Sequence, residues 1–399
     1  MEQPVFIAGA GVISAIGNTV AQNLLSLEQE KTGIAPIQYL DTEHRDEFPV
    51  GEIKLSNQEL AELSGFKPGI SRTAMLSSIA AKEALADTEL ANLAGLRTGF
   101  ISANTVGGMD KTEDFFRDFL ANNTKGRLRN VVNNECDAVT NLVADQLGIR
   151  HYVSTISTAC SSSANAIMYG ARLIKNNILD VVIAGGADAF TRFTLNGFNT
   201  LMILDKQPCQ PFDANRRGLN LGEGAGYVVL VSARIASSLK KEMYCTLSGY
   251  HNANDAYHQT ASSPEGTGSL LAMEGALKKS GLKPADIGYI NLHGTGTQNN
   301  DSSEGAAISK LFAGYTPQIS STKAFTGHTL GASGGIEAVF SALAVQRGLV
   351  YPNLRFETSM EGLPFTPETR FSKQPEIKHV LSNSFGFGGN CSSLIFSKL

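Results

Sequence analysis

The sequence contains no tryptophan, few charged residues and no long apolar run. Asp, Glu, Lys and Arg make up 18% of its 399 residues, and the formal net charge is only −4. Because Lys and Arg are scattered rather than clustered, the chain offers no basic footprint for nucleic acid or an anionic membrane. No apolar run approaches the roughly 18 to 20 residues that a membrane-spanning helix needs. We therefore expect small or protein-borne substrates, with no nucleic acid and no membrane insertion.

Cysteine is sparse as well. The five cysteines are odd in number, far apart and without CxxC spacing, which argues against a disulfide framework or a zinc site. The apolar N-terminal stretch carries Glu2 in place of a positive charge and is interrupted by Gly9 and Gly11. We interpret it as a buried first strand rather than a secretion signal. Reduced thiols then favour a cytoplasmic protein.

Apolar strand-like runs alternate with helical patterns along the whole chain, which predicts an α/β fold. Most of these strand runs are continuously apolar, as in a sheet covered by helices on both faces. The predicted strands are 98–104, 179–186, 226–232, 287–293 and 380–385, and the predicted helices are 70–85, 163–176 and 334–348.

The chain also carries a faint internal duplication. Three segments of the first half recur in the same order in the second: 99–108 with 287–296, 157–174 with 321–343, and 222–232 with 385–397. We therefore predict two related halves, 1–240 and 241–399, whose site residues converge between them.

Cys160 follows a short strand and directly precedes a helical pattern in ISTACSSSANAIMYGARLI. A thiol at a helix N-terminus is expected to have a lowered pKa, because unpaired N–H groups and the helix dipole stabilise the thiolate. The turn resembles a nucleophile elbow built with cysteine. From this segment alone, a small buried structural cysteine is an equally good interpretation.

Three glycine-rich segments of the second half carry further candidates. His293 begins HGTGTQNNDSSE at a strand end, and Lys323 and His328 lie five residues apart in KAFTGHTLGASGG. NSFGFGGN contains Phe385 and Phe387, where glycines would let backbone N–H groups face an oxyanion while an aromatic ring closes a pocket. Each segment alone also fits a structural histidine or an ordinary tight turn.

Taken together, these segments resemble the β-ketoacyl-acyl carrier protein synthases of the thiolase superfamily. The resemblance covers nearly the whole chain. It is carried by TACSSS, PFDANRRGLNLGEGAG, HGTGTQNNDSSE, KAFTGHTLGASGG and NSFGFGGN, in that order. It implies a thiolase-like fold of two duplicated halves in αβαβα layers, with the nucleophile in 1–240 and both catalytic histidines in 241–399.

The resemblance also implies a reaction: decarboxylative condensation of an acyl group held on Cys160 with a malonyl unit on acyl carrier protein. His293 and His328 would stabilise the enolate. Lys323 and Glu304 would form an ion pair that orients the two histidines.

Further roles follow from the same resemblance. The N–H groups of Cys160 and Phe387 would form the oxyanion hole, and Phe387 would gate the site. Residues expected to bind substrate or the pantetheine arm are Thr295, Thr297, Val106, Gly197, Phe198 and Phe385. No metal or cofactor is implied. The expected partners are acyl carrier protein and a second subunit, either an identical copy or a chain-length-factor-like ketosynthase.

Several alternatives fit the residues less well. GAGVISAIG places its third glycine too late for a nicotinamide-binding fingerprint. A biosynthetic thiolase would place a second catalytic cysteine before a C-terminal glycine cluster, whereas Cys391 follows FGFGGN. A cysteine hydrolase gives Lys323 and the second histidine no purpose, and a chain-length factor would have lost the nucleophile.

Two departures from the housekeeping fatty-acid enzymes lie near the site. ILDKQPCQPFD is shorter than usual, and GGNCSS replaces GGTN. They raise the hypothesis of a specialised polyene or polyketide pathway, such as aryl polyene pigment synthesis, with a heterodimeric partner.

Overall fold

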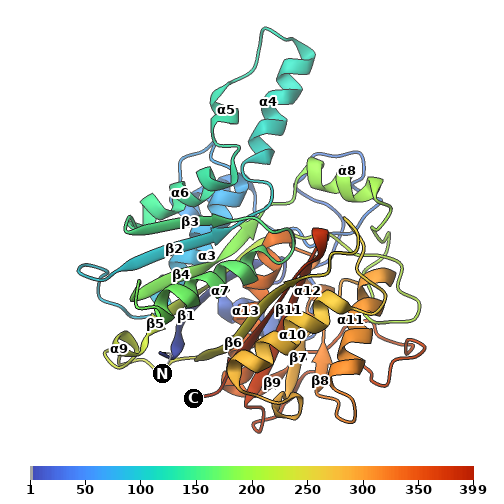
Figure 1. Ribbon diagram of the computed structural model, residues 1–399. Helices are drawn as coiled ribbons and strands as arrows, with labels where there is room; N and C mark the ends of the chain where they lie inside the picture. Colours follow the sequence, from blue (N-terminus) through green and yellow to red (C-terminus); the bar gives the residue numbers. More distant parts are fainter. Residues whose placement is uncertain (1–2) are drawn as a thin grey trace.

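The computed structural model describes residues 3–399 and contains one ten-stranded mixed sheet (Figure 1). Glu2, on which the interpretation of the N-terminus partly rests, lies outside these residues. The strand order is β3-β2-β4-β5-β1-β6-β12-β11-β7-β8. The strands are β1 (Val5–Ser14), β2 (Thr98–Ala103), β3 (Tyr152–Ile156), β4 (Val181–Asp188), β5 (Gly224–Ser232), β6 (Cys245–Asn254), β7 (Tyr289–Asn291), β8 (Gln318–Ser320), β11 (His379–Gly386) and β12 (Asn390–Ser397), with β9 (Leu349–Val350) and β10 (Ser372–Lys373) as a separate pair.

The pairing directions repeat in the two halves of the sheet. From β1 outward, two antiparallel pairs with β5 and β4 are followed by two parallel pairs with β2 and β3. From β6 outward, the same sequence runs through β12, β11, β7 and β8. The halves meet where Phe6 pairs with Thr246 and Ile7 with Cys245. The predicted duplication is confirmed, while the boundary at residue 240 stays a prediction.

The helices form three layers around the strands. They are α1 (Val20–Glu28), α2 (Asn57–Ser64), α3 (Arg72–Asp87), α4 (Met109–Ala121), α5 (Arg129–Val132), α6 (Cys136–Leu147), α7 (Ser162–Lys175), α8 (Arg192–Thr200), α9 (Ala233–Ala236), α10 (Thr267–Ser280), α11 (Gln298–Leu311), α12 (Lys323–Thr326) and α13 (Ser333–Arg347). One outer core packs α3 and α6 on the N-terminal strands, and another packs α10 and α11 on the C-terminal strands.

Helices α7 and α13 form the middle layer, in contact with strands of both halves (Figure 1). All residues of α13 from Ser333 to Val345 are buried. The helix approaches β5 so closely that a Cβ on Gly226 would lie 2.3 Å from the backbone nitrogen of Ile336. Glycine is required at this contact because real Cβ atoms do not come that near to backbone atoms.

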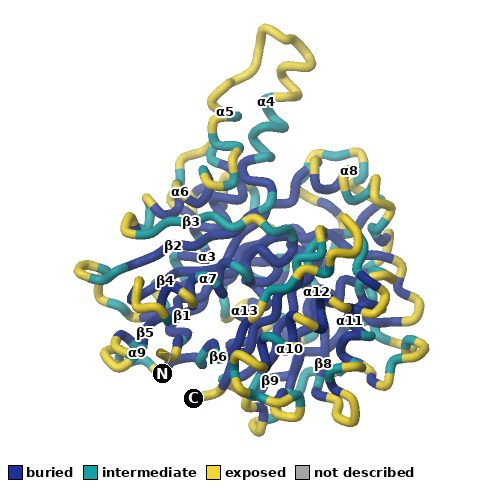
Figure 2. The backbone as a smooth tube through the Cα atoms, in the orientation of Figure 1, coloured by how far each residue is buried: buried dark blue, intermediate teal, exposed yellow. Residues whose placement is uncertain are grey.

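Residues 109–134, which comprise α4, the following loop and α5, project from the body as an arm (Figures 1 and 2). No residue of α4 is buried. Four large apolar side chains of the arm are more than half exposed: Phe116, Leu120, Leu128 and Val132. The arm therefore presents apolar surface that the described chain does not cover.

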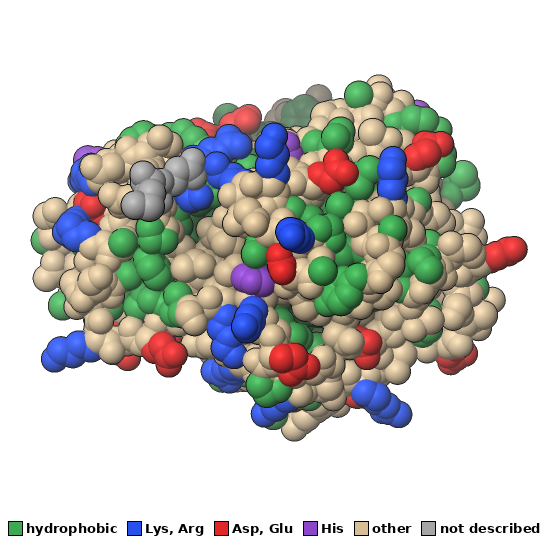
Figure 3. Space-filling view, turned by 60° about the horizontal axis from the view of Figure 1, so that its bottom comes forward, with side chains coloured by type: hydrophobic (Ala, Val, Ile, Leu, Met, Phe, Trp, Pro, Cys, Tyr) green, Lys and Arg blue, Asp and Glu red, His purple; other side chains and the backbone are tan. Residues whose placement is uncertain are grey.

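The remaining surface is mixed. On the face shown in Figure 3, basic and acidic side chains are interspersed among polar and apolar ones. Within residues 3–399, every helix is too short or too polar to cross a membrane. The cysteines are all free thiols.

Candidate active site

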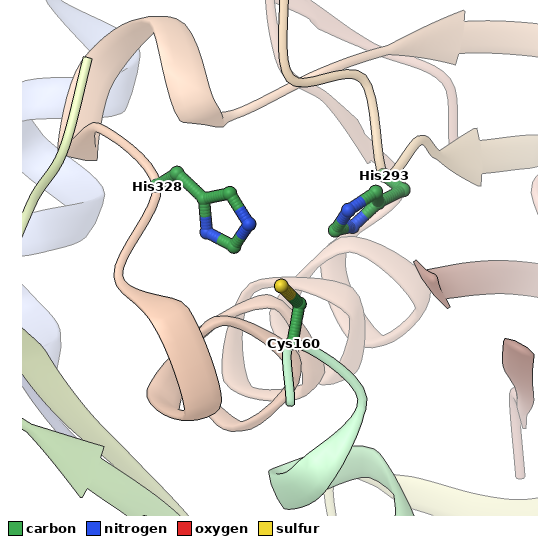
Figure 4. Close-up of side chains that lie close together, drawn as sticks. All are labelled: Cys160, His293 and His328. Carbon is green, nitrogen blue, oxygen red and sulfur yellow. The ribbon is translucent and has the colours of Figure 1, made fainter. Parts of the chain in front are cut away.

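Cys160 lies on a tight turn between β3 and α7, one residue before the helix cap. Its predecessor, Ala159, has a φ of +53°, a left-handed conformation that costs a non-glycine residue about 1 to 2 kcal/mol. The turn directs the thiol away from the helix and toward the second half of the chain (Figure 4). The side chain is 5% exposed. The predicted strand, turn and helix are therefore present around the thiol.

His293 and His328 meet Cys160 from the other half of the molecule (Figure 4). His293 follows β7, and His328 follows α12. The sulfur and one ring nitrogen of each histidine lie within 4.8 Å of one another. The two rings are nearly perpendicular, with centroids 5.4 Å apart. Cys160 thus forms one buried cluster with two histidines that lie more than 130 positions away in the sequence.

The hydrogen bonds of His328 define its tautomer. The backbone N–H of Leu330 donates to Nδ1 at 3.2 Å, and the Ser333 hydroxyl lies 3.0 Å from the same atom. A backbone N–H can only donate, so Nδ1 must accept and the neutral ring carries its proton on Nε2. Burial, followed by the charge of Lys323, holds the pKa of both His293 and His328 well below the usual value. Both rings are therefore neutral in the resting site.

The thiol of Cys160 does not titrate as its place at a helix N-terminus predicts. Burial raises its pKa to about 11, against the opposing influence of Lys323 and of the N–H groups of Phe387 and Cys160 itself. The prediction of a stabilised thiolate is wrong, because desolvation of the charge outweighs these nearby donors. The two N–H groups predicted to form the oxyanion hole do both face the sulfur.

The predicted ion pair between Lys323 and Glu304 is also wrong. Lys323 pairs instead with Glu337, and both side chains are buried. Glu304 accepts hydrogen bonds from the N–H groups of His293 and Gly294, both at 2.9 Å, and from Asn383 at 3.0 Å. It therefore fixes the backbone that carries His293 rather than neutralising Lys323. Burial raises the pKa of Glu304 and of Glu337 to about 7.

Glu337 is a residue that the sequence analysis missed. It is the single acidic residue of α13, a helix that is otherwise almost entirely apolar in its buried part. A lone carboxylate in such a helix indicates a buried partner of opposite charge, because an unpaired buried charge is very costly. That pattern, GGIEAVFSALAV, was the available signal.

The cluster opens into a cavity of about 300 Å³. Thr295, Thr297, Phe198, Phe385 and Phe387 all line it, as predicted for substrate-binding positions. The rings of Phe198 and Phe387 stack with centroids 5.9 Å apart. Lining residues that the sequence analysis missed include Met202, Ile203, Arg217, Leu219, and the backbone segments 260–262 and 298–300.

Val106 and Gly197 are not among the residues that line this cavity. Val106 is buried and follows Thr105, whose N–H and hydroxyl donate to the carboxylate of Asp188. Gly197 lies on α8, where a Cβ would meet no other atom within 4 Å. The cavity beside Cys160 is therefore bounded by other residues, and a role for these two in the acyl pocket stays a prediction.

Comparison with models of protein families identifies the family of this chain. The N-terminal domain of the β-ketoacyl synthases matches residues 2–236, and the C-terminal domain of the same family matches residues 244–357.

The chain belongs to the β-ketoacyl synthase family.

Individual relatives agree with this assignment. The 3-oxoacyl-[acyl-carrier-protein] synthase 2 of Staphylococcus aureus (strain COL) is 33% identical over 409 residues, covering 99% of this ketosynthase and 98% of that protein. The Coxiella burnetii enzyme of the same name is 32% identical, covering 99% and 98%. The layered thiolase-type fold and the classification as an acyl-transferring condensing enzyme, both expected from the sequence, are confirmed.

Solved structures resemble this ketosynthase over its full length. The ishigamide ketosynthase/chain length factor superposes with a TM-score of 0.94 at 27% identity and covers 100% of both chains. The ketosynthase ApeO in complex with its chain length factor ApeC, from Xenorhabdus doucetiae, has a TM-score of 0.85 at 30% identity and covers 100% of this chain and 98% of that one.

The same thiol and two imidazoles form a set of ligands that a Zn²⁺ ion accepts. Three protein ligands would leave a fourth position open, as in catalytic zinc sites. In this ketosynthase, however, Nε2 of His328 carries a proton in the resting tautomer, whereas a ligating nitrogen must be bare. Metal binding here would therefore compete with the resting hydrogen-bond pattern.

Proposed function

We propose that this ketosynthase holds an acyl chain as a thioester on Cys160 and condenses it with a malonyl unit presented by acyl carrier protein. The observation that carries the proposal is the convergence of one buried thiol and two neutral imidazoles at the end of a cavity lined by hydroxyl and aromatic side chains. A thiol is a strong nucleophile toward a thioester, and the exchange conserves the bond type.

The first step transfers the acyl group. The Cys160 sulfur attacks the carrier thioester and loses its proton, and the carrier leaves as a free thiol, so that one thioester replaces another. Because the resting thiol is neutral, its proton must move as the new bond forms. The neutral ring of His293 lies close enough to receive it and to pass it to the departing carrier thiolate. The N–H groups of Cys160 and Phe387 stabilise the tetrahedral oxyanion.

The second step forms the carbon-carbon bond. The malonyl thioester loses carbon dioxide and leaves an enolate, whose oxygen accepts a hydrogen bond from Nε2–H of His328 and from His293. The carbanion attacks the acyl group on Cys160, the 3-oxoacyl chain remains on the carrier, and the cysteine takes up a proton again. One correctly placed donor to such an oxygen contributes about 3 kcal/mol to lowering the barrier.

The other predicted features complete this proposal. Thr295 and Thr297, whose hydroxyls lie 2.9 Å apart in the cavity wall, bind the phosphopantetheine arm of the carrier. The substrates arrive covalently carried, so the reaction requires no cofactor or metal of its own. Free thiols throughout the chain support a cytoplasmic location.

The partner subunit is proposed to bind at the arm and at β3. Strand β3 lies at an edge of the sheet, where the described residues pair with it only through β2. An unpaired edge beside exposed apolar side chains is a natural site for association. Two of the most similar structures are named as ketosynthase and chain length factor pairs, which supports a second ketosynthase-like chain as the partner. A stable homodimer in size-exclusion chromatography with light scattering would instead identify an identical copy.

The test is intact-protein mass spectrometry after incubation with saturated and polyunsaturated acyl carrier thioesters. A mass gain of one acyl group is expected, and it should be lost in Cys160→Ala and kept in Cys245→Ala, which removes a buried thiol of β6 outside the cavity. The preferred chain distinguishes housekeeping from polyene or polyketide elongation. A mass gain that survives Cys160→Ala would contradict the proposal.

A further inference from the structure

Asp188 is a wholly buried carboxylate that the proposed reaction does not use. It ends β4, and its charge is one of the causes that raise the pKa of Cys160. Its oxygens accept from the N–H of Thr105 at 2.9 Å, from the Thr105 hydroxyl at 2.8 Å and from the N–H of Gly331 at 2.7 Å. Such a carboxylate is costly to bury and is retained where its hydrogen bonds fix a structure.

Gly331 belongs to the turn that follows His328, and the N-terminal half holds it from two sides. Asp188 accepts its N–H, and the Ser163 hydroxyl of α7 donates to its carbonyl. A Cβ on Gly331 would lie 2.7 Å from Oδ2 of Asp188 and 2.8 Å from the methyl group of Thr105. The turn that carries Gly331 therefore packs directly against the Asp188 carboxylate of the other half, and a side chain larger than that of glycine would clash there.

Of the two residues between His328 and Gly331, the second is strained. Leu330 has a φ of +52°, in the left-handed region that costs a non-glycine residue about 1 to 2 kcal/mol. In this conformation its N–H reaches Nδ1 of His328. A strained residue persists only where its surroundings fix it. Gly331 directly follows Leu330, so its hydrogen bonds to Asp188 and Ser163 help to hold Leu330 in this conformation.

We propose that Asp188 is a positioning residue for His328: by holding Gly331 it keeps the Leu330 N–H on Nδ1 and so keeps the ring proton on Nε2, toward Cys160. The use of that proton in condensation rests on the proposed function. The tautomer itself does not. Asp188 makes no hydrogen bond to the reacting atoms. Apart from its charge, which helps to raise the pKa of Cys160, it acts through the backbone of residues 329–331.

The test is ¹⁵N nuclear magnetic resonance of substrate-free protein labelled in histidine, with the His328 signal assigned by its loss in His328→Ala. A protonated and a bare ring nitrogen have well-separated shifts, so the tautomer is read directly. The wild type should show Nε2–H alone. In Asp188→Asn one acceptor oxygen becomes an NH₂ group and the other loses its charge, so the hydrogen bond from the Gly331 N–H is weakened or lost in either orientation of the amide. The turn is then loosened, and Nδ1–H should appear.

Two further variants keep the result interpretable. Asp180→Asn removes a carboxylate that precedes the opposite end of β4, where it pairs with Arg97 and Arg234, and it should leave the His328 signal unchanged. Should Asp188→Asn fail to fold, Gly331→Ala disturbs the same contact from the other side, and Nδ1–H is again expected. An unchanged Nε2–H tautomer in the folded variant would overturn the proposal.

Kinetics give a second readout. Acylation of Cys160 should not slow in Asp188→Asn, because the variant removes a charge that raises the pKa of the thiol. Condensation should slow by about 10²-fold, as for a catalytic group displaced by about 1 Å. An equal loss in both steps would indicate a general structural defect and would contradict the positioning role. Because the tautomer is measured without substrate, failure of the wild type to condense any acyl group would count against the proposed function alone.

Discussion

The catalytic centre and the arm depart in opposite directions from the usual distribution of side chains. At the centre, Lys323, Glu337, Glu304 and Asp188 are charged groups buried within the protein, and each is matched by partners from the same chain. On the arm, large apolar side chains are exposed and nothing in the described chain covers them. The buried charged groups have their partners within one subunit, whereas the apolar side chains of the arm have no cover within the described chain. If the second subunit binds at the arm as proposed, chemistry and assembly are separated in space, and a substitution at one should leave the other unchanged.

The largest effect is expected from breaking the buried ion pair. Lys323→Met leaves the Glu337 carboxylate uncompensated and should destabilise the protein by about 3 to 5 kcal/mol in denaturant unfolding. The double variant Lys323→Met/Glu337→Gln removes both charges and should recover most of that stability. Loss of equal stability in both variants would contradict the pairing described above.

Removing an enolate donor should affect the second reaction step alone. His328→Ala is expected to slow condensation by about 10²- to 10³-fold, because a hydrogen bond made in the transition state is lost. Acylation of Cys160, measured by intact mass, should proceed. His379→Ala, which removes a half-buried histidine bonded to Ser397 outside the cavity, serves as the control and should leave both steps unchanged.

The pH dependence of thiol reactivity tests the electrostatics of the centre. The pKa of Cys160 is about 11. As long as the pH is below that value, the thiolate fraction rises about tenfold with each unit by which the pH is raised. Alkylation by iodoacetamide should therefore accelerate steadily from pH 6 to 9, since both histidines stay neutral throughout. A plateau below pH 8 would show that the helix N-terminus outweighs burial after all.

The smallest effect on the chain itself is expected at the arm. Leu120→Ser and Leu128→Ser replace exposed apolar residues, so the unfolding free energy of the isolated subunit should change by no more than about 0.5 kcal/mol. Light scattering should nevertheless show loss of the dimer that the subunit forms, whether with a second ketosynthase-like chain or with an identical copy. Leu63→Ser, at a position on α2 that is also more than half exposed, is the control and should leave the dimer intact. A dimer that survives both arm substitutions would place the interface elsewhere.

The sequence predicts this centre unevenly, and the reasons differ from residue to residue. Cys160, His293 and His328 stand in glycine-rich turns beside strands, so their local motifs identify them and the duplication explains why they meet. The partner of Lys323 could not be read in the same way, because Glu304 and Glu337 are both acidic and nearby in sequence and only the packing of α13 decides between them. The pKa of Cys160 depends on how much water reaches the sulfur, which no motif encodes.

The contribution of Asp188 was missed for a related reason. Its partners Thr105 and Gly331 lie 83 and 143 positions away, and one of them belongs to the other half of the chain. No local pattern reports a hydrogen bond of that kind. The strands and helices that were predicted are present in the structure, because each depends on periodicity within a few residues.

The shared middle layer has a consequence for how this protein can be divided. Helix α13 belongs to the second half, yet its Gly335 lies against Gly226 of β5 in the first half. A chain cut near residue 240 would therefore leave the first piece with an uncovered sheet face and the second with a helix built to be enclosed on all sides. The two halves share the same order of strand-pairing directions, yet neither is expected to be soluble when made separately. Complementation between the two fragments should therefore require that they be synthesised together.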